Sequence, residues 1–344
     1  MKPWRTHFLT SLLITGLCIS STHATEILGA GATFPYPLYS KMLSAYNMKT
    51  NIKVNYQSIG SGGGIRQLLN KTVDFGATDG FMSDQELKNS REAILHIPMS
   101  LGAVSIAYNL PGITKLKLTG AVIANIYLGQ IKTWNDPQIQ KINPRIKLPA
   151  TQIVVAHRSD GSGTSAIFTD YLCKVSLPWQ QKVGQGTSLN WPTGIGAKGN
   201  EGVAGILKLA PGSIGYIEII YAKQNKMTYA EIQNKAGQFV SPSLETIAAA
   251  SDIKIPADTR VSITDSKKGY PISGFTWIIV YKNQNYGNRK ESQAQDLTNL
   301  LWWMTHDGQA YSAALDYVSL PKSVVAKAEI LIKSISYNGV KVKK

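Results

Sequence analysis

The sequence predicts an α/β fold in two domains that share crossover strands, and three observations lead to this prediction. From Thr25 onward, short runs of β-forming residues alternate with helical patterns, which is typical of mainly parallel sheets. Beyond residues 1–24 about 320 residues remain, more than one hydrophobic core usually supports. No low-complexity linker separates two independent units.

Residues 1–24 have the pattern of a secretory signal peptide. Lys2 and Arg5 precede an apolar run over residues 8–19, and Thr22-His23-Ala24 resembles a small-residue cleavage site. We expect cleavage after Ala24. No later apolar stretch approaches the roughly 20 residues that a membrane-spanning helix requires. The sequence therefore predicts an exported protein.

The first part of the mature chain repeats a unit of strand, glycine-rich turn and helix. A strand and turn at 26–34 lead into a helix that opens at Pro35, where proline fits a first turn. Leu38, Met42 and Tyr46 recur at four-residue spacing on one face of this helix. The expected elements that follow are a strand at 53–59, a turn at 60–64, a helix at 65–73 and a strand at 74–79.

The rest of the chain continues the alternation. A β-rich run over 94–109 ends before Pro111-Gly112, which we expect to be the crossing point between the domains. The later expected elements are a helix at 119–129, a strand at 152–158, a loop at 194–199 leading into a helix, a buried strand within 269–282, and a helical tail.

Three strand-to-helix turns share one design, which favours an anion site. They are GAGATFP at 29–35, GSGGG at 60–64 and DGSGTS at 160–165. Each places glycines and a hydroxyl residue where a helix begins, so free N–H groups and the positive end of the helix dipole face outward. One such turn would indicate only a helix cap, because Ser and Thr are ordinary capping residues. Three in one chain favour a site for an anion.

Arg158 and Asp79 sharpen this prediction. Arg158 has a planar guanidinium that can donate to two oxygens at once, and Asp160 is near enough in sequence to orient it. The alternative is a surface ion pair between Arg158 and Asp160. Asp79 ends a strand, where a carboxylate would repel an anion unless that anion carries a proton. Phosphate keeps a proton near neutral pH and sulfate does not, so Asp79 would favour phosphate. The alternative is a simple turn carboxylate.

Composition and spacing exclude or weaken other classes of protein. The formal charge is +15, or +13 without Lys2 and Arg5, which indicates anionic partners or simply solubility. The basic clusters are not interleaved with aromatic residues, so we expect no nucleic-acid partner. The histidines lack metal-ligand spacing, and Cys173 reads as a buried inert thiol. GIGAKG at 194–199 formally fits a dinucleotide motif but follows no clean strand.

The chain resembles a known family over nearly its whole mature length. The matching segments, in order, are GAGATFPYPLY, KVNYQSIGSGGG, TVDFGATD with MSD, IYLGQIKTWNDPQI, RSDGSGTS, GAKGNEGV in place of the usual GKGNEG, PGSIGYIE, AKQN and LDYVSLP. These segments resemble the periplasmic phosphate-binding subunit of the bacterial high-affinity phosphate ABC transporter, the PstS family.

The resemblance implies a periplasmic-binding-protein type II-like fold whose two lobes close on inorganic phosphate, with no metal and no cofactor. Its implied phosphate ligands are backbone N–H and hydroxyl donors, one arginine and one proton-accepting carboxylate: Ala32, Thr33, Phe34, Ser61, Asp79, Arg158, Ser162, Gly163 and Thr164. Asp160 would orient Arg158. His157 stands where many members have a second arginine, and the residues Gly62, Thr78, Gly80 and Phe81 also depart from the family.

The resemblance also implies an organisation and partners. We expect lobe I to comprise residues 25–108 and 272–344, and lobe II residues 109–271. The protein would be a periplasmic monomer that performs no reaction and delivers phosphate to inner-membrane permease subunits with their ATPase. Two alternatives from other classes remain: an exported phosphatase with the same anion cradle, and a surface adhesin that uses the basic charge. The phosphatase lacks an evident nucleophile–base pair or metal cluster in the sequence, and the adhesin predicts binding to anionic polymers that survives mutation of Arg158.

Overall fold

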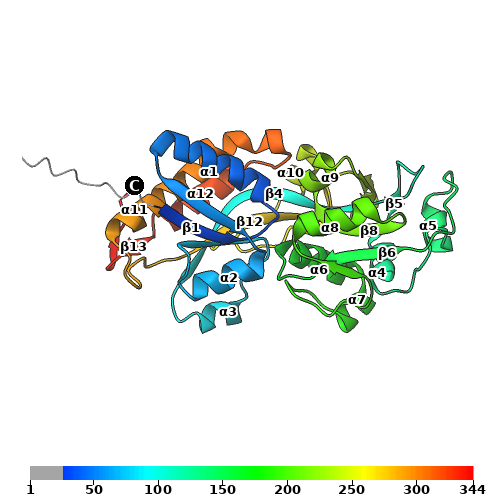
Figure 1. Ribbon diagram of the computed structural model, residues 1–344, viewed down its shortest axis with the longest axis horizontal. Coiled ribbons are helices and arrows are strands. Elements are labelled where there is room, and N and C mark those ends of the chain that lie inside the picture. The colour runs from blue at the N-terminus through cyan, green and yellow to red at the C-terminus, as the bar shows by residue number, and fades with distance from the viewer. Residues whose placement is uncertain (1–25, 344) are drawn as a thin grey trace, which may run out of the picture.

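The computed structural model describes residues 26–343, and two halves lie side by side along its long axis (Figure 1). The predicted signal peptide and its cleavage after Ala24 lie outside the described residues. We keep the names lobe I and lobe II for the two sets of residues given above. Among the described residues, no helix is long and apolar enough to cross a membrane.

One twisted sheet runs through both lobes. Its main strands are β1 (Glu26–Gly31), β2 (Lys53–Ser58), β3 (Phe75–Thr78), β4 (Ile94–Tyr108), β6 (Val154–Arg158), β7 (Ile195–Ala197), β8 (Ser213–Glu218) and β12 (Ser273–Tyr281). Within the described part of the chain their order is β2-β1-β3-β12-β4-β8-β6-β7, and β9 (Thr228–Tyr229) also pairs with β4. The outer pairs in both lobes are parallel, whereas β12 and β4 pair antiparallel with their neighbours. The predicted α/β fold with crossover strands is confirmed.

Strand β4 belongs to lobe I as defined above, and its last residues extend into the sheet of lobe II. Its residues up to Ala103 pair with β12, and those from Val104 to Tyr108 pair with β8. The change of pairing partner therefore lies within β4. The sequence analysis expected the crossing between domains later in the chain, at Pro111-Gly112. The reason for the difference is that β4 is a continuous apolar run, buried along almost all of its length, as is usual for strands covered on both faces.

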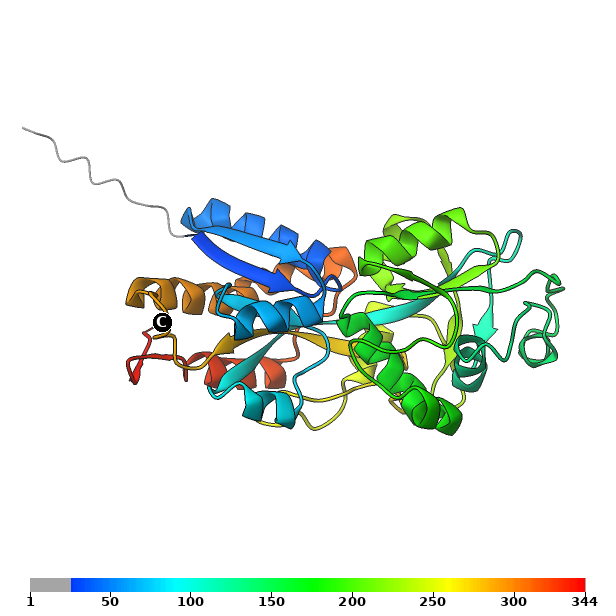
Figure 2. The same ribbon diagram turned by 60° about the horizontal axis from the view of Figure 1, so that its bottom comes forward.

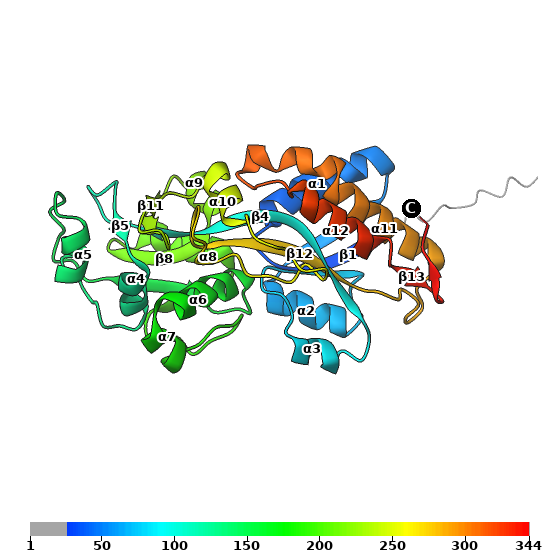
Figure 3. The same cartoon turned by 180° about the vertical axis from the view of Figure 1, so that it is seen from behind.

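Helices cover both faces of the sheet in each lobe (Figures 1 and 3). Lobe I has α1 (Tyr36–Thr50), α2 (Ser61–Leu69), α3 (Asp84–Asn89), α11 (Glu291–Thr305) and α12 (Lys322–Ile332), with two short 3₁₀ helices at Asp307–Tyr311 and Ala313–Leu315. Lobe II has α4 (Gly120–Tyr127), α5 (Pro137–Ile142), α6 (Gly163–Val175), α7 (Leu177–Lys182), α8 (Gly199–Leu209), α9 (Ile219–Gln224) and α10 (Leu244–Ala250). As predicted, Leu38, Met42 and Tyr46 form a buried face of α1.

Five further short strands complete the described chain. The strands β5 (Lys117–Leu118), β10 (Glu231–Gln233) and β11 (Phe239–Val240) form a small sheet at the far end of lobe II, and β13 (Ser336–Tyr337) pairs with β14 (Val340–Lys341) near the C-terminus. With β9, they lie away from the centre of the molecule and position no part of the site (Figures 1 and 3).

Two local predictions differ from the structure. Helix α2 begins at Ser61, so the glycines predicted as a turn form its first helical turn. Close packing explains them: a Cβ on Gly64 would lie 2.5 Å from the Ala30 carbonyl oxygen. The predicted loop at 194–199 contains β7, which pairs in parallel with β6 before α8 begins. Both differences bring a helix N-terminus closer to the middle of the molecule.

Candidate anion-binding site

The turn between β1 and α1 presents its N–H groups because tyrosine hydroxyls hold its carbonyl groups. The donors come from three separate segments: Tyr56 bonds the Ala32 carbonyl (2.7 Å), Tyr221 the Thr33 carbonyl (2.7 Å) and Tyr317 the Phe34 carbonyl (2.6 Å). The Thr33 and Phe34 N–H groups donate to no group in residues 26–343. Because a peptide's N–H points opposite to its carbonyl, Tyr56 and Tyr221 orient the Thr33 and Phe34 N–H groups, whereas the peptide that Tyr317 holds precedes Pro35 and has no N–H. The sequence analysis did not identify these tyrosines.

Asp79 follows β3 and is buried beside Ser61, the first residue of α2. The Ser61 hydroxyl accepts the Asp79 N–H at 3.2 Å, and Thr276 donates to one carboxylate oxygen, Oδ1, at 2.8 Å. The other oxygen, Oδ2, is buried and has no hydrogen-bond partner in the described chain. Burial raises the pKa of Asp79 to about 7, against the lowering effects of Thr276, Arg158 and Ser61. An unpartnered buried acceptor of this kind calls for a donor.

Arg158 ends β6 with a guanidinium that is almost fully buried. Its Nε and Nη2 donate to the two carboxylate oxygens of Asp160, at 2.6 and 2.5 Å, and its Nη1 donates to the Thr164 hydroxyl at 3.3 Å. Burial by itself would raise the pKa of Asp160. The hydrogen bonds and charge of Arg158, with the Gly199 N–H, outweigh that effect and hold the pKa below its ordinary value. The cation is thus present, fixed in orientation and held by an ionised partner.

The N-terminus of α6 lies directly against Ser61 and Asp79. A Cβ on Gly163 would lie 2.4 Å from the Ser61 hydroxyl oxygen and 2.5 Å from Asp79 Oδ2. The N–H groups of Gly163 and Thr164, in the first turn, have no intrahelical acceptor. Ser162 caps the helix through its hydroxyl oxygen, and its own N–H is taken by the Thr187 carbonyl at 2.7 Å. Ser162 therefore keeps only its hydroxyl proton for another partner.

The lobes touch on both sides of these groups. The Gly62 N–H of α2 donates to the Gly161 carbonyl across the lobes at 2.9 Å. Figure 2 shows α2 and α6 meeting in the middle of the molecule. On the side of the turn between β1 and α1, Lys223 of lobe II forms an ion pair with Asp316 of lobe I, with 2.5 Å between Nζ and Oδ1. Beside Asp79 the lobes leave a cavity of about 440 Å³, whose wall includes Phe81, Ile167, Phe275 and Trp277.

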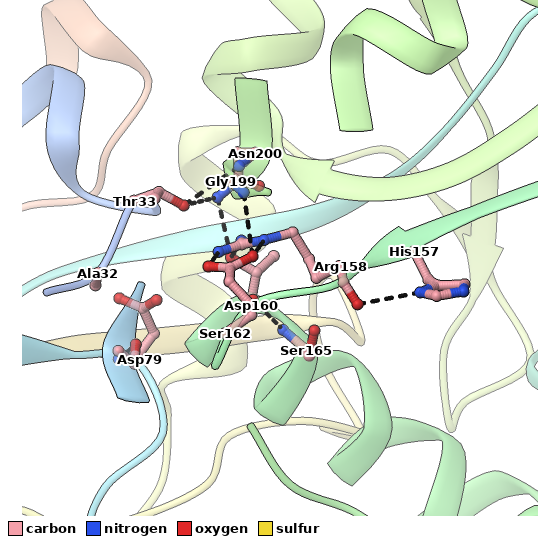
Figure 4. A network of polar contacts seen from close by, with 12 residues as sticks. Ala32, Thr33, Asp79, His157, Arg158, Asp160, Ser162, Ser165, Gly199 and Asn200 are labelled. Atoms are coloured by element: carbon pink, nitrogen blue, oxygen red, sulfur yellow. Dashed lines mark hydrogen bonds and ion pairs between the residues drawn. The ribbon is translucent and has the colours of Figure 1, made fainter. Parts of the chain in front are cut away.

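Asn200, at the start of α8, is a site residue that the sequence analysis missed. Its side-chain amide donates to the Thr33 hydroxyl at 2.7 Å and to the Thr164 hydroxyl at 3.1 Å, so it links the two lobes (Figure 4). The signal was present, because Asn200 belongs to the segment GAKGNEGV that carried part of the resemblance. The loop interpretation of 194–199 drew attention away from it.

The predicted site residues thus meet at one place from five separate segments. Figure 4 shows Thr33, Asp79, Arg158, Ser162 and Asn200 around a common centre, whereas His157 points away from it. The His157 ring stacks on Trp191 with centroids 4.9 Å apart, and its Nδ1 lies 3.0 Å from the Arg158 carbonyl oxygen. His157 therefore cannot serve Ser162 as a base. In the described part of the chain, no three metal-ligating side chains gather.

The arrangement has the donors, cation and acceptor that binding of a small anion requires. It collects N–H and hydroxyl donors from helix starts, one fixed cation and one acceptor carboxylate with a raised pKa. Such a set suits a small tetrahedral oxyanion that carries at least one proton. A sulfate-like anion without a proton would leave Asp79 Oδ2 facing another acceptor.

The chain matches known proteins over most of its length. A family model described as "PBP superfamily domain" matches residues 19–307. The phosphate-binding protein PstS of Pasteurella multocida is 44% identical over 316 residues, covering 90% of both chains. The phosphate-binding protein PstS of Haemophilus influenzae is 46% identical over 310 residues, covering 88% of this chain and 91% of its own.

Solved structures share the fold. A phosphate-binding protein from Stenotrophomonas maltophilia superposes with a TM-score of 0.69 at 18% identity, covering 92% of this chain and 97% of that one. A high-affinity periplasmic phosphate-binding protein bound with phosphate gives a TM-score of 0.72 at 22% identity, with the same coverage of 92% and 97%. At these identities the likeness extends to the fold alone.

Proposed function

The chain belongs to the PstS family of phosphate-binding proteins within the PBP superfamily, and from this premise we propose that it binds inorganic phosphate between its two lobes and delivers it to an ABC permease. The family consists of substrate-binding transport proteins, so the chain is a binding protein and not an enzyme. Phosphate is its ligand, and no cofactor takes part.

The observation that carries the proposal is the buried, unpartnered Oδ2 of Asp79 among groups that are otherwise donors. Phosphate near neutral pH has three oxygens that accept hydrogen bonds and at least one hydroxyl that donates. The hydroxyl of phosphate would donate to Asp79 Oδ2. The remaining oxygens would accept hydrogen bonds from the N–H groups of Thr33 and Phe34 in the turn between β1 and α1. They would also accept from the Ser61 hydroxyl and the Arg158 guanidinium.

We propose the phosphate ligands that the sequence predicted, except Ala32, with Asn200 added as a neighbour. From lobe I come Thr33, Phe34, Ser61 and Asp79, and from lobe II come Arg158, Ser162, Gly163 and Thr164. Ala32 was also predicted, but its N–H donates to the Ala77 carbonyl at 2.9 Å, so it offers the anion no donor. Because the ligand contacts both lobes, it stabilises the closed arrangement more than an open one. The crossover strands β4 and β12 would act as the hinge.

Membership of the family supports a proposal for the partners and the location. The protein would act in the periplasm as a monomer after removal of residues 1–24, and it would pass phosphate to inner-membrane permease subunits driven by their ATPase. Its 13 excess positive charges, counted without Lys2 and Arg5, would favour approach of anions at low salt. The cavity beside Asp79 offers phosphate a route between the lobes.

The test is a calorimetric titration of the mature protein, unfolded and refolded to strip bound ligand, with phosphate and separately with sulfate at pH 8. We expect one-to-one phosphate binding and no heat with sulfate. No phosphate binding would contradict the proposal. Steady release of phosphate from a chromogenic monoester would favour the phosphatase instead, and binding to anionic polymers that survives mutation of Arg158 would favour the adhesin.

A further inference from the structure

Asn200 has a hydrogen-bonding arrangement that a helix cap does not require. It is fully buried as the second residue of α8. Its two Nδ2 protons go to two different hydroxyls, those of Thr33 in lobe I and Thr164 in lobe II. Its Oδ1 accepts the Glu218 N–H at 2.9 Å. Every strong donor and acceptor of the amide group is therefore used.

The Glu218 N–H fixes which way the amide faces. A backbone N–H can only donate, so the atom 2.9 Å from it must be the amide oxygen. The NH₂ group then faces the two threonine hydroxyls and can only donate to them. The orientation of the amide follows from this chemistry alone.

Each threonine hydroxyl is thereby committed as a donor toward the site. The Thr164 oxygen accepts from Asn200 at 3.1 Å and from Arg158 Nη1 at 3.3 Å. The Thr33 oxygen accepts from the Asn200 side chain at 2.7 Å and from its backbone N–H at 3.4 Å. A hydroxyl has two lone pairs and one proton, so with both lone pairs engaged its proton must point elsewhere. Figure 4 shows Thr33 and Asn200 at the centre where the other anion donors converge, and the Thr164 hydroxyl lies within hydrogen-bond distance of both Asn200 and Arg158.

We propose that Asn200 is a positioning residue that turns the Thr33 and Thr164 hydroxyls into obligate donors to phosphate and joins the two lobes when they close. This inference rests on the proposed function, because it assumes phosphate as the anion. Asn200 acts through the two hydroxyls and touches no phosphate oxygen in this role. Because both hydroxyls then donate, Asp79 remains as the hydrogen-bond acceptor for the anion. Asn200 therefore supports the selection of an anion that carries a proton.

The decisive variant is Asn200→Asp, which keeps the shape but replaces the NH₂ donor with an acceptor. At pH 8 its carboxylate would attract both hydroxyl protons away from the anion and add negative charge beside it. We expect the Kd for phosphate to rise at least about 100-fold. As the pH falls to 5.5 the new carboxyl takes up a proton and regains a donor. The ratio of variant to wild-type Kd should therefore fall with pH.

Asn200→Ala and a matched asparagine serve as comparisons. Asn200→Ala frees the hydroxyls without reversing them, so its Kd should rise about 10-fold with the same pH profile as the wild type. Asn143 is also buried, with Nδ2 donating to two carbonyls (Lys117 and Ile139) and Oδ1 accepting the Lys117 N–H, far from the site. Asn143→Asp should lower the melting temperature and leave the Kd unchanged.

The outcomes separate the two levels of inference. Wild-type protein that binds no phosphate overturns the proposed function and this proposal with it. Wild-type binding with unchanged Kd in both Asn200 variants overturns only the positioning role. A loss in Asn200→Asp that does not recover at low pH relative to the wild type also overturns it, since a purely structural residue would behave in that way. Should Asn200→Asp fail to fold, unchanged affinity in Asn200→Ala decides against the role.

Discussion

Replacing Asp79 by asparagine tests how the site would distinguish phosphate from sulfate. In the wild type, the buried Oδ2 of Asp79 would accept the phosphate hydroxyl. A hydrogen bond to a charged group contributes about 1.5–3 kcal/mol, so its loss should weaken phosphate binding about 10- to 100-fold. The side chain keeps its size, and its other oxygen can still accept from Thr276.

Sulfate should respond in the opposite direction. Against the wild-type carboxylate, sulfate would place two negative charges about 3 Å apart with no proton between them, which costs about 5 kcal/mol at an effective dielectric constant of 20. In Asp79→Asn the amide NH₂ can donate to sulfate instead. Removing this repulsion should raise sulfate affinity by about four orders of magnitude, so the ratio of phosphate to sulfate affinity should narrow by about 10⁵-fold or more.

Calorimetric titrations at pH 8 measure both changes, and the pH must be controlled because of the raised pKa. With a pKa of about 7, Asp79 is ionised at pH 8 and mostly protonated at pH 5.5, where a protonated carboxyl can donate to sulfate. Wild-type protein should therefore begin to bind sulfate at low pH. Thr276→Val removes a hydrogen bond that lowers the pKa of Asp79, so this variant should begin to bind sulfate at a higher pH than the wild type. If Asp79→Asn binds phosphate and still rejects sulfate at pH 8, the proton-acceptor role is wrong.

Three further predictions concern the cation, lobe closure and pH. Arg158→Gln should weaken phosphate binding more than about 100-fold, because it removes the buried cation that would face the anion. It should also lower stability by about 3–5 kcal/mol, because Asp160 loses its partner; calorimetry checks the loss of affinity, and circular dichroism checks that the fold persists. Gly60→Ala should raise the Kd for phosphate at least about 10-fold, because the new Cβ would lie 2.3 Å from Asp160 Oδ2 at a residue whose φ is +88°. A Kd equal to that of the wild type would contradict the close approach of the two lobes at Gly60. In the absence of ligand, the free energy of unfolding measured with denaturant should fall as the pH rises from about 4 to 7. This fall should exceed the fall in Asp79→Asn by up to about 4 kcal/mol. The unfolded Asp79 carboxyl ionises near 3.8, while the folded one keeps its proton to about pH 7.

Local patterns in the sequence were sufficient to predict several of the longer strands and helices. The four-residue spacing of Leu38, Met42 and Tyr46 predicted a buried helix face, because that spacing follows directly from helix geometry. The apolar run over 94–109 predicted the buried strand β4 for a similar reason. Gly64 was assigned to a turn, because sequence alone cannot show that it is needed for close packing against the neighbouring strand β1.

The residues of the candidate site also divide into those that the sequence predicted and those that it missed. Arg158, Asp160 and the hydroxyls of 162–164 lie close together in the chain, so their spacing predicted an anion site and the pairing of Arg158 with Asp160. Asn200 and the three tyrosines escaped notice. Their partners are far apart in sequence, and nothing in a single segment shows which carbonyl or hydroxyl a side chain will reach.

The sequence by itself determined the alternation of strands and helices, the glycine-rich helix starts and the supply of one arginine and one carboxylate, because these depend on neighbouring residues. Only the tertiary structure decided that Asp79 keeps a buried oxygen without a partner, that Asn200 spans the lobes, and that β4 changes partners at Val104. Burial, pKa and hydroxyl orientation depend on which distant segments pack together, and that is settled by the whole fold.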